Sequence, residues 1–215
     1  MHVFILALCL LLTASCARKD LAPVSELTWH GNNREASNHK VRYGETLYSV
    51  AFLYDQDYQK LAKYNHLKSY ALRENQILKL LPREKYKTRQ FNTGKLRFNW
   101  PITGRVIKRF SVAKASKGIN ISGYKMEPVK ASASGVVAYA GNGIPGYGQL
   151  ILIKHNNQFL TAYGNNAVNL VKEGQQVKAG QVIGKVGYLD RQHSGLHFEI
   201  RRSGKPVNPL LYIQK

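Results

Sequence analysis

The 215-residue sequence predicts an α+β protein, in which a small βααβ domain precedes an all-β domain built on an antiparallel sheet. The first observation is helical periodicity, since Leu47, Val50, Ala51 and Tyr54 recur at i, i+3, i+4 and i+7. The second is that the apolar segments after residue 100 are short and interrupted by glycine, with no long helical stripe. Apolar residues make up 44% of the chain, which is enough for each domain to have a core.

The N-terminus predicts export. Residues 1–15 contain no Lys, Arg, Asp or Glu, and their apolar run is far shorter than the ~20 residues that span a bilayer, so we expect a signal peptide. The small residues 13–15 followed by Cys16 resemble the bacterial lipoprotein processing box. The resemblance implies a lipid on Cys16 and, with Ala17 next, sorting to the outer membrane of a Gram-negative envelope. An ordinary cleaved signal with an incidental cysteine is the alternative.

Charge and cysteine content limit the function classes. The formal net charge is +20, and residues 97–215 hold 17 basic against 4 acidic side chains. Such a field favours polyanionic partners. Because the chain is expected to be exported, we expect the anionic cell wall and membrane surface as partners, and no nucleic acid. Both cysteines, Cys9 and Cys16, precede the body of the chain, which excludes a disulfide framework or a cysteine-based zinc site there.

The elements of the first domain follow in order after a polar tether at residues 16–37. Residues 40–43 alternate as a strand, and a turn leads to Thr46, which is a favourable helix N-cap. The first helix follows, and Asp57 can cap a second one. Residues 67–72 form a connecting loop, and residues 76–80 alternate as a closing strand.

Residues 38–82 resemble a LysM domain over its full length. The matching positions are Val41, 44–47, Val50, Ala51, Tyr54, Leu61, Asn65, Leu67 and 75–78. The resemblance implies a shallow groove that binds N-acetylglucosamine-containing glycan, as in peptidoglycan. Its candidate residues lie in two loops, Gly44, Glu45, Thr46 and Leu47 in the first and Leu67, Tyr70, Ala71 and Leu72 in the second. The alternative is that Leu47, Leu67 and Leu72 belong to the core.

A basic linker is predicted at residues 83–98, where six Lys and Arg stand against Glu84. The second domain, at 99–213, has strand-like segments at 135–141, 149–153, 159–163 and 196–201. Their close spacing favours an antiparallel sandwich or a partial barrel.

An ordered series of motifs in this second domain resembles the LytM or lysostaphin-type zinc endopeptidases over residues 97–213. It comprises 100–104, 117–121, 129–131, 135–137, 146–148, 153–155, 161–163, 174–184, 196–200 and 206–210. Together with the lipoprotein-like N-terminus and the LysM-like module, the whole chain resembles the NlpD-type murein hydrolase activators.

The resemblance also assigns roles to five positions. Active LytM-type enzymes hold zinc with a His, an Asp and a second His, and two further histidines assist. The first ligand position is Ser116, the aspartate position is Asn120, the assisting positions are Asn165 and Gly195, and the second ligand is His197. Because a catalytic zinc needs about three protein ligands, the resemblance implies a degenerate domain without catalytic residues, metal or other cofactor.

The remaining histidines offer little compensation. His193 and His155 lie one repeat away and on a separate strand, so we do not expect a rebuilt metal site. We expect His155 and His197 to be hydrogen-bonded structural residues.

By resemblance, then, the chain is expected to be a periplasmic, outer-membrane-tethered protein that binds peptidoglycan and activates an N-acetylmuramoyl-L-alanine amidase during septal splitting and cell division. The five positions above are the candidate partner-binding cleft. Two alternatives stay open. One is an envelope-anchoring protein without amidase activation, and the other is an active zinc murein endopeptidase.

Overall fold

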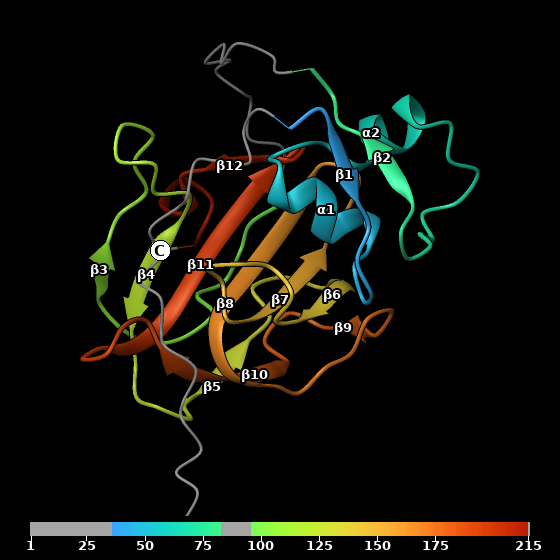
Figure 1. Cartoon of the computed structure of the whole chain (residues 1–215). Helices are drawn as coiled ribbons and strands as arrows, with labels where there is room; N and C mark the ends of the chain where they lie inside the picture. Colours follow the sequence, from blue (N-terminus) through green and yellow to red (C-terminus); the bar gives the residue numbers. More distant parts are fainter. Residues whose placement is uncertain (1–35, 83–95, 215) are drawn as a thin grey trace, which may run out of the picture.

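A computed structural model describes residues 36–82 and 96–214 (Figure 1). The predicted signal peptide, the predicted lipidation site Cys16, most of the tether and residues 83–95 of the linker lie outside these residues. In the two described segments, no helix is long and apolar enough to cross a membrane.

The first domain has the predicted βααβ order. Its elements are β1 (Asn38–Lys40), α1 (Leu47–Leu53), α2 (Tyr58–Tyr64) and β2 (Ile77–Lys79), and β1 pairs antiparallel with β2. Thr46 caps α1 in a capping box with Ser49, and the Asp57 side chain caps α2 by accepting two backbone N–H bonds.

The first strand begins earlier than the predicted 40–43. Its pairing with the closing strand ends at Val41, whose backbone N–H donates to Gln76 at 2.8 Å. The chain then turns through Gly44, which has a φ of +75° that favours glycine. The alternation beyond residue 41 therefore belongs to the turn and not to the strand.

The second domain is a ten-stranded sheet in which every pair of named strands is antiparallel. The strand order is β3-β4-β11-β10-β8-β7-β6-β9, with β12 on β11, β5 on β10 and a direct pairing of β11 with β8. The strands are β3 (Val106–Lys108), β4 (Ile119–Ser122), β5 (Pro128–Lys130), β6 (Gly135–Gly141), β7 (Gln149–Lys154), β8 (Phe159–Asn169), β9 (Gln176–Val177), β10 (Val182–Tyr188), β11 (Ser194–Arg202) and β12 (Lys205–Val207), and a 3-10 turn, η2 (Pro209–Leu211), follows. The predicted α+β class with an antiparallel second domain is confirmed.

The central strands are apolar on both faces of the sheet. In β7, Ile151 and Ile153 point into the core of the second domain, and Leu150 and Leu152 point to the opposite side. This alternation follows from the two-residue period of a strand. A strand with two apolar faces needs a covering layer on each.

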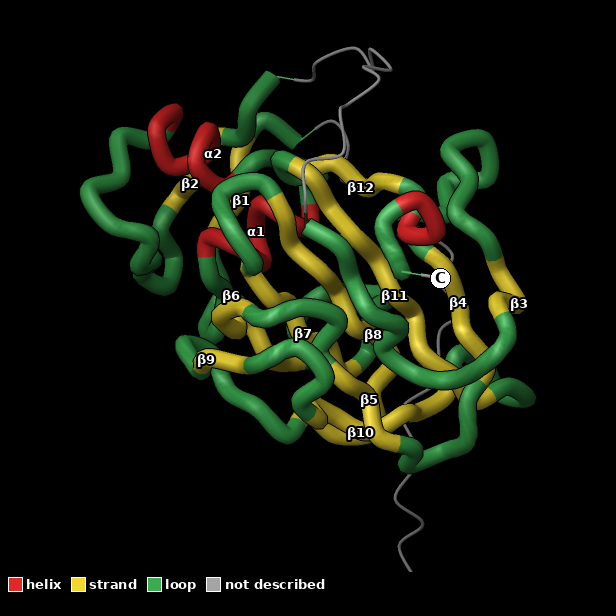
Figure 2. Tube along the Cα trace, turned by 180° about the vertical axis from the view of Figure 1, so that it is seen from behind, coloured by secondary structure: helices red, strands yellow, loops and turns green. Residues whose placement is uncertain are grey.

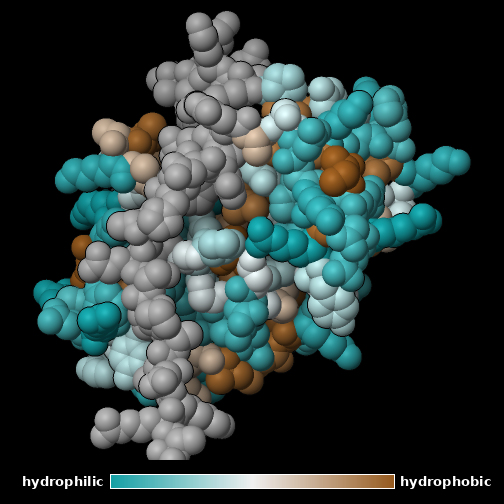
Figure 3. Space-filling view, viewed as in Figure 1, coloured by the Kyte–Doolittle hydropathy of each residue, from teal (hydrophilic) through white to brown (hydrophobic). Residues whose placement is uncertain are grey.

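The first domain supplies the second layer. Figures 1 and 2 place α1 beside the ends of β6, β7 and β8. One buried cluster joins the domains, with Leu47, Val50, Phe52, Leu61 and Leu78 from the first and Ala138, Tyr147, Leu150, Leu152, Leu160 and Ala162 from the second. On the face in view, the surface around the first domain is mostly hydrophilic with small apolar patches (Figure 3).

The boundary of the second domain differs from the predicted one. Phe98, the last residue of the predicted linker, is fully buried and forms a parallel bridge with Ile213. Its backbone N–H donates to the Tyr212 carbonyl at 3.1 Å. The linker prediction to residue 98 is therefore wrong at its end, because a single apolar anchor follows a run of charged residues.

Candidate functional site

Strand β11 presents a buried polar face toward the first domain. His197, Glu199 and Arg201 alternate with Leu196, Phe198 and Ile200, which enter the core of the second domain. His197 is 6% exposed, Glu199 0% and Arg201 1%. Charged groups at this depth need partners, so their contacts define the site. We call Lys117, Asn120, Tyr147, His197, Glu199 and Arg201 the β11 site.

Both ring nitrogens of His197 face acceptor oxygens. The Nδ1 atom lies 2.8 Å from Asn120 Oδ1, and the Nε2 atom lies 3.0 Å from Glu199 Oε1. The β4–β11 register places His197 directly opposite Asn120. A ring that donates from both nitrogens satisfies this geometry and presents no free lone pair.

Glu199 and Arg201 form the centre of the β11 site. Arg201 Nε donates to Glu199 Oε2 at 2.8 Å, and the Tyr147 hydroxyl donates to Glu199 Oε1 at 2.7 Å. Arg201 Nη1 reaches the first domain, where it donates to the Phe52 carbonyl at 2.7 Å and to Asp55 Oδ1 at 2.9 Å. Lys117 Nζ binds the same Asp55 oxygen at 2.6 Å. The site therefore extends across the domain boundary.

The charges perturb one another. Burial opposes ionisation of Glu199, but the Arg201 guanidinium and then His197 outweigh it and hold the pKa of Glu199 well below its usual range. Burial, followed by repulsion from Arg201, lowers the pKa of Lys117 to about 8, although Asp55 acts in the opposite direction. Burial and then Glu199 raise the pKa of Tyr147 well above its ordinary value, so Tyr147 is a neutral donor.

The other predicted cleft residues have backbone partners. The Ser116 hydroxyl donates to the Gly118 carbonyl at 3.3 Å. Asn165, at a φ of +63°, donates from Nδ2 to the Tyr188 carbonyl at 2.8 Å, and its buried Oδ1 has no partner. A Cβ atom on Gly195 would lie 2.3 Å from the Ile121 carbonyl oxygen, so this position excludes a side chain in the present backbone. Of the five positions, the structure joins Asn120 and His197 directly.

The two other histidines considered from the sequence have their own partners. His155 Nδ1–H donates to the Ser134 carbonyl at 2.8 Å, and Nε2 contacts Thr161 Oγ1 at 2.8 Å. Burial lowers the pKa of His155 to about 4. His193 lies just before β11, exposed and paired with Asp190 at 2.9 Å. These contacts fit the structural roles expected for His155 and His197.

The candidate glycan loops are partly exposed and partly used by the fold. Gly44 and Ala71 are exposed, and Tyr70 is 41% exposed. Leu47 is fully buried in the cluster that joins the domains, and Leu67 and Leu72 pack against it. Leu47 therefore belongs to the core, which is the alternative that the sequence left open.

Two further residues of the first loop hold the domain in place. Glu45 Oε2 accepts from His39 Nε2 at 2.7 Å and from the Arg42 backbone at 2.8 Å. The Thr46 hydroxyl donates to the Ala138 carbonyl of β6 at 3.3 Å. The accessible part of the predicted groove is thus Gly44, Tyr70 and Ala71, with Tyr70 edge-on to Tyr48 and Tyr58.

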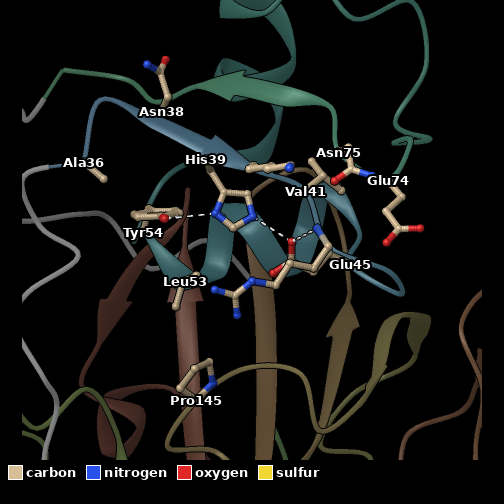
Figure 4. Close-up of a pocket in the computed structure, with 12 residues that line it drawn as sticks. Ala36, Asn38, His39, Val41, Glu45, Leu53, Tyr54, Glu74, Asn75 and Pro145 are labelled. Atoms are coloured by element: carbon tan, nitrogen blue, oxygen red, sulfur yellow. Dashed lines mark hydrogen bonds and ion pairs between the residues drawn. The ribbon is translucent and has the colours of Figure 1, made fainter.

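A cleft of about 580 Å³ lies beside β1 (Figure 4). His39 stands at its centre between the Tyr54 hydroxyl, 3.0 Å from Nδ1, and Glu45. Glu74 and Asn75 line one side, and Pro145 of the β6–β7 connection faces them from the second domain. Sequence reasoning did not identify this cleft, because it forms only where the two domains meet.

Comparisons with known proteins match both domains. The model of Peptidase family M23 matches residues 114–209, and that of the LysM domain matches residues 39–80. The solved structure of Helicobacter pylori Csd3 resembles the chain with a TM-score of 0.50 and 28% identity, over 56% of this chain and 34% of that one.

Named relatives carry the same pair of domains in their family. The chain is 50% identical over 117 residues to the lipoprotein NlpD/LppB homolog of Pseudomonas aeruginosa, covering 54% of this chain and 39% of that protein. It is 49% identical over 117 residues to murein hydrolase activator NlpD of Escherichia coli, covering 54% of this chain and 31% of that protein. The chain belongs to the NlpD-type LysM and M23 lipoproteins.

A further NlpD-type relative aligns with more of the chain. Outer membrane antigenic lipoprotein B of Histophilus somni is 32% identical over 222 residues, covering 81% of this chain and 66% of that protein. The alignments to the Pseudomonas and Escherichia relatives span only about a third of those proteins' length.

The M23 family implies zinc, but the β11 site does not fit this metal. Across residues 36–82 and 96–214, no group of three or more His, Cys, Asp and Glu side chains could hold a metal ion. His197 uses both nitrogens in hydrogen bonds, and Arg201 neutralises the carboxylate of Glu199. A cationic guanidinium in the site opposes a divalent ion. No step through zinc follows from this geometry.

Sequence reasoning missed the charged members of this site, which are Asp55, Lys117, Tyr147, Glu199 and Arg201. A signal was present, since His197, Glu199 and Arg201 occupy alternate positions of an otherwise apolar strand. Polar residues at i, i+2 and i+4 share one face of a strand. Because the opposite face is apolar and buried, the polar face indicates either solvent or a paired, buried network.

Restoring one histidine is not expected to restore hydrolysis. Asn165→His leaves Ser116 and Asn120 in two ligand positions, and His197 stays bound to Glu199. We expect the variant to carry no stoichiometric zinc by elemental analysis and to release no dye from labelled sacculi. Zinc at one equivalent with chelator-sensitive release would contradict this expectation.

Proposed function

We propose that the chain is a non-catalytic, peptidoglycan-binding lipoprotein that activates a cell-wall N-acetylmuramoyl-L-alanine amidase. The observation that carries the proposal is the β11 site, where an ion network centred on Glu199 and Arg201 stands at the place of an M23 zinc centre. The name murein hydrolase activator, given to the Escherichia coli relative, supports the same function.

The two domains would divide the work. The LysM domain places the chain on glycan, through the exposed loop positions Gly44, Tyr70 and Ala71 and the chemistry of its family. The M23-type domain binds the amidase at its former catalytic face, around Ser116, Asn120, Asn165, Gly195 and His197. Binding activates the amidase only if this domain has a higher affinity for the amidase's active state than for its inactive state.

Localisation belongs to the proposal as well. A lipid on Cys16 would hold the protein at the outer membrane, facing the periplasm, and the relatives named lipoproteins support this placement. The excess of basic side chains in residues 97–215 favours attraction to the anionic wall. Such a protein would act in septal peptidoglycan splitting during cell division.

The test is dye release from labelled sacculi by a cognate amidase, with and without the purified chain. We expect no release by the chain alone and a clear acceleration of the amidase. Release by the chain alone with one equivalent of zinc would establish an endopeptidase instead. Binding to sacculi with unchanged amidase rates would favour an envelope-anchoring protein.

Trp or Tyr positions in the glycan groove can be tested separately. Tyr70→Ala is expected to weaken binding to sacculi several-fold, because an exposed aromatic ring packs on sugar faces. Tyr64→Ala, another exposed tyrosine of the same domain outside the predicted loops, is the matched control. Equal sacculus binding by both variants in a co-sedimentation assay would remove Tyr70 from the groove.

A further inference from the structure

The contact between the two domains is built on a single carboxylate oxygen. Asp55 Oδ1, just after α1, lies 2.6 Å from Lys117 Nζ and 2.9 Å from Arg201 Nη1. The Lys117 and Arg201 side chains are 9% and 1% exposed, while that of Asp55 is 28% exposed. Two buried cations of the M23-type domain thus converge on one partly exposed anion from the other domain.

The surroundings fix this geometry. The Phe52 ring stacks on the Arg201 guanidinium, 3.5 Å from ring centroid to Cζ, and packs edge-on against Tyr147 at 5.0 Å. Glu199 holds Arg201 from the other side through Nε. A carboxylate receptor is therefore preorganised by contacts within the M23-type domain and closed by the LysM domain.

The LysM domain fits closely over this receptor. The hollow between the domains beside Phe52, Gln56 and Arg201 measures about 10 Å³, about the least space that a water molecule needs. Gly204, in the β11–β12 turn, approaches so closely that a Cβ atom would lie 2.1 Å from the Gln56 carbonyl oxygen. The receptor is accessible to another molecule only if the LysM domain moves.

We propose that Lys117 and Arg201 form a carboxylate-binding subsite of the M23-type domain, which Asp55 occupies from within the chain and which an acidic side chain of a protein partner takes when the LysM domain is displaced. The acidic partner is favoured by charge, because residues 97–215 carry 17 basic and 4 acidic side chains. The subsite deepens the proposed function, since it states which chemistry of the amidase would engage the β11 site.

Two substitutions are expected to release the LysM domain. Asp55→Gly removes the carboxylate, and glycine accepts the φ of +54° at this position without strain. Gly204→Ala introduces the clash with Gln56. The matched controls are Glu74→Gln, an exposed carboxylate of the same domain, and Gly174→Ala, which has a φ of +80° like the +76° of Gly204 but no atom within 4 Å.

Hydrogen–deuterium exchange on the full chain measures this release. We expect exchange in peptides from α1 and β11 to rise roughly 10- to 100-fold in Asp55→Gly and Gly204→Ala, the effect of losing charge-assisted bonds. The two controls should match the unsubstituted chain. Unchanged exchange in both test variants would overturn the proposal.

Binding of a hexaglutamate peptide tests the chemistry of the subsite. We expect Asp55→Gly to bind it at least tenfold more tightly than the unsubstituted chain does, and Asp55→Gly with Lys117→Met to lose the gain. A hexaglutamine peptide should bind none of the proteins. Equal hexaglutamate affinity with and without Lys117 would show that only the general positive charge attracts the peptide, and would overturn the subsite.

Failure of the proposed function can be told apart from failure of the subsite. If exchange and peptide binding change as expected but no amidase is accelerated, the subsite stands and the activator function fails. If the amidase is accelerated equally by the unsubstituted chain and Asp55→Gly while exchange is unchanged, the function stands and the subsite fails.

Discussion

Replacing Arg201 by methionine is expected to lower the free energy of unfolding by about 3–5 kcal/mol, the usual cost of removing one partner of a buried ion pair. Arg201 is 1% exposed and binds Glu199, Asp55 and the Phe52 carbonyl. Methionine has a similar length but no charge, so Glu199 would remain buried with only Tyr147 and His197 as donors.

Urea unfolding followed by circular dichroism measures this loss. Arg191→Met is the matched control, because Arg191 is exposed in the β10–β11 connection, and we expect it to change stability by less than about 0.5 kcal/mol. A loss of under 1 kcal/mol for Arg201→Met would mean that the ion network contributes little. Arg201→Met with Glu199→Met should recover part of the loss, because neither charge is then buried alone.

The protein is also expected to lose about 3 kcal/mol of stability between pH 6.5 and pH 4 through His155 alone. Burial holds the pKa of His155 near 4, whereas the unfolded chain has the ordinary value of 6.5. In this interval the unfolded state binds more protons than the folded state, so stability falls as the pH falls. Above pH 6.5 the ring is neutral in both states and the effect is absent.

Urea unfolding at pH 7, 5.5 and 4.5 tests this dependence. We expect His155→Gln to be less stable at pH 7, since it loses the bonds to Ser134 and Thr161, but to show a flatter pH profile. The matched control is His193→Gln, which changes an exposed histidine and should keep the original slope. An unchanged slope in His155→Gln would contradict the assignment. Below pH 4.5, protonation of Glu199 on unfolding adds a second loss.

Local sequence signals were sufficient for the small domain. Thr46 and Asp57 begin the two helices as expected, because a side-chain oxygen at the N-cap satisfies free backbone N–H groups through neighbouring residues alone. The end of the first strand was misjudged by a few residues, since alternation continues into the turn before Gly44. Boundaries of this kind depend on which backbone groups find partners on the other strand.

The candidate site was predicted only in part. Asn120 and His197 were identified by resemblance, and their hydrogen bond follows from the register of β4 and β11. Asp55 and Lys117 were not identified, because they are 62 residues apart and neither belongs to a motif. Their contact depends on how one domain packs on the other.

The sequence by itself determined the two domain types, their order and the NlpD-type relationship, because these depend on periodicity, caps and motifs that are local in the chain. It also indicated that β7 is apolar on both faces, as Leu150, Ile151, Leu152 and Ile153 follow one another. Only the tertiary structure decided that the LysM domain covers the second face and places Asp55 against Arg201. Apolar burial is non-directional, so the sequence shows that a face must be covered, and the packed structure shows by what.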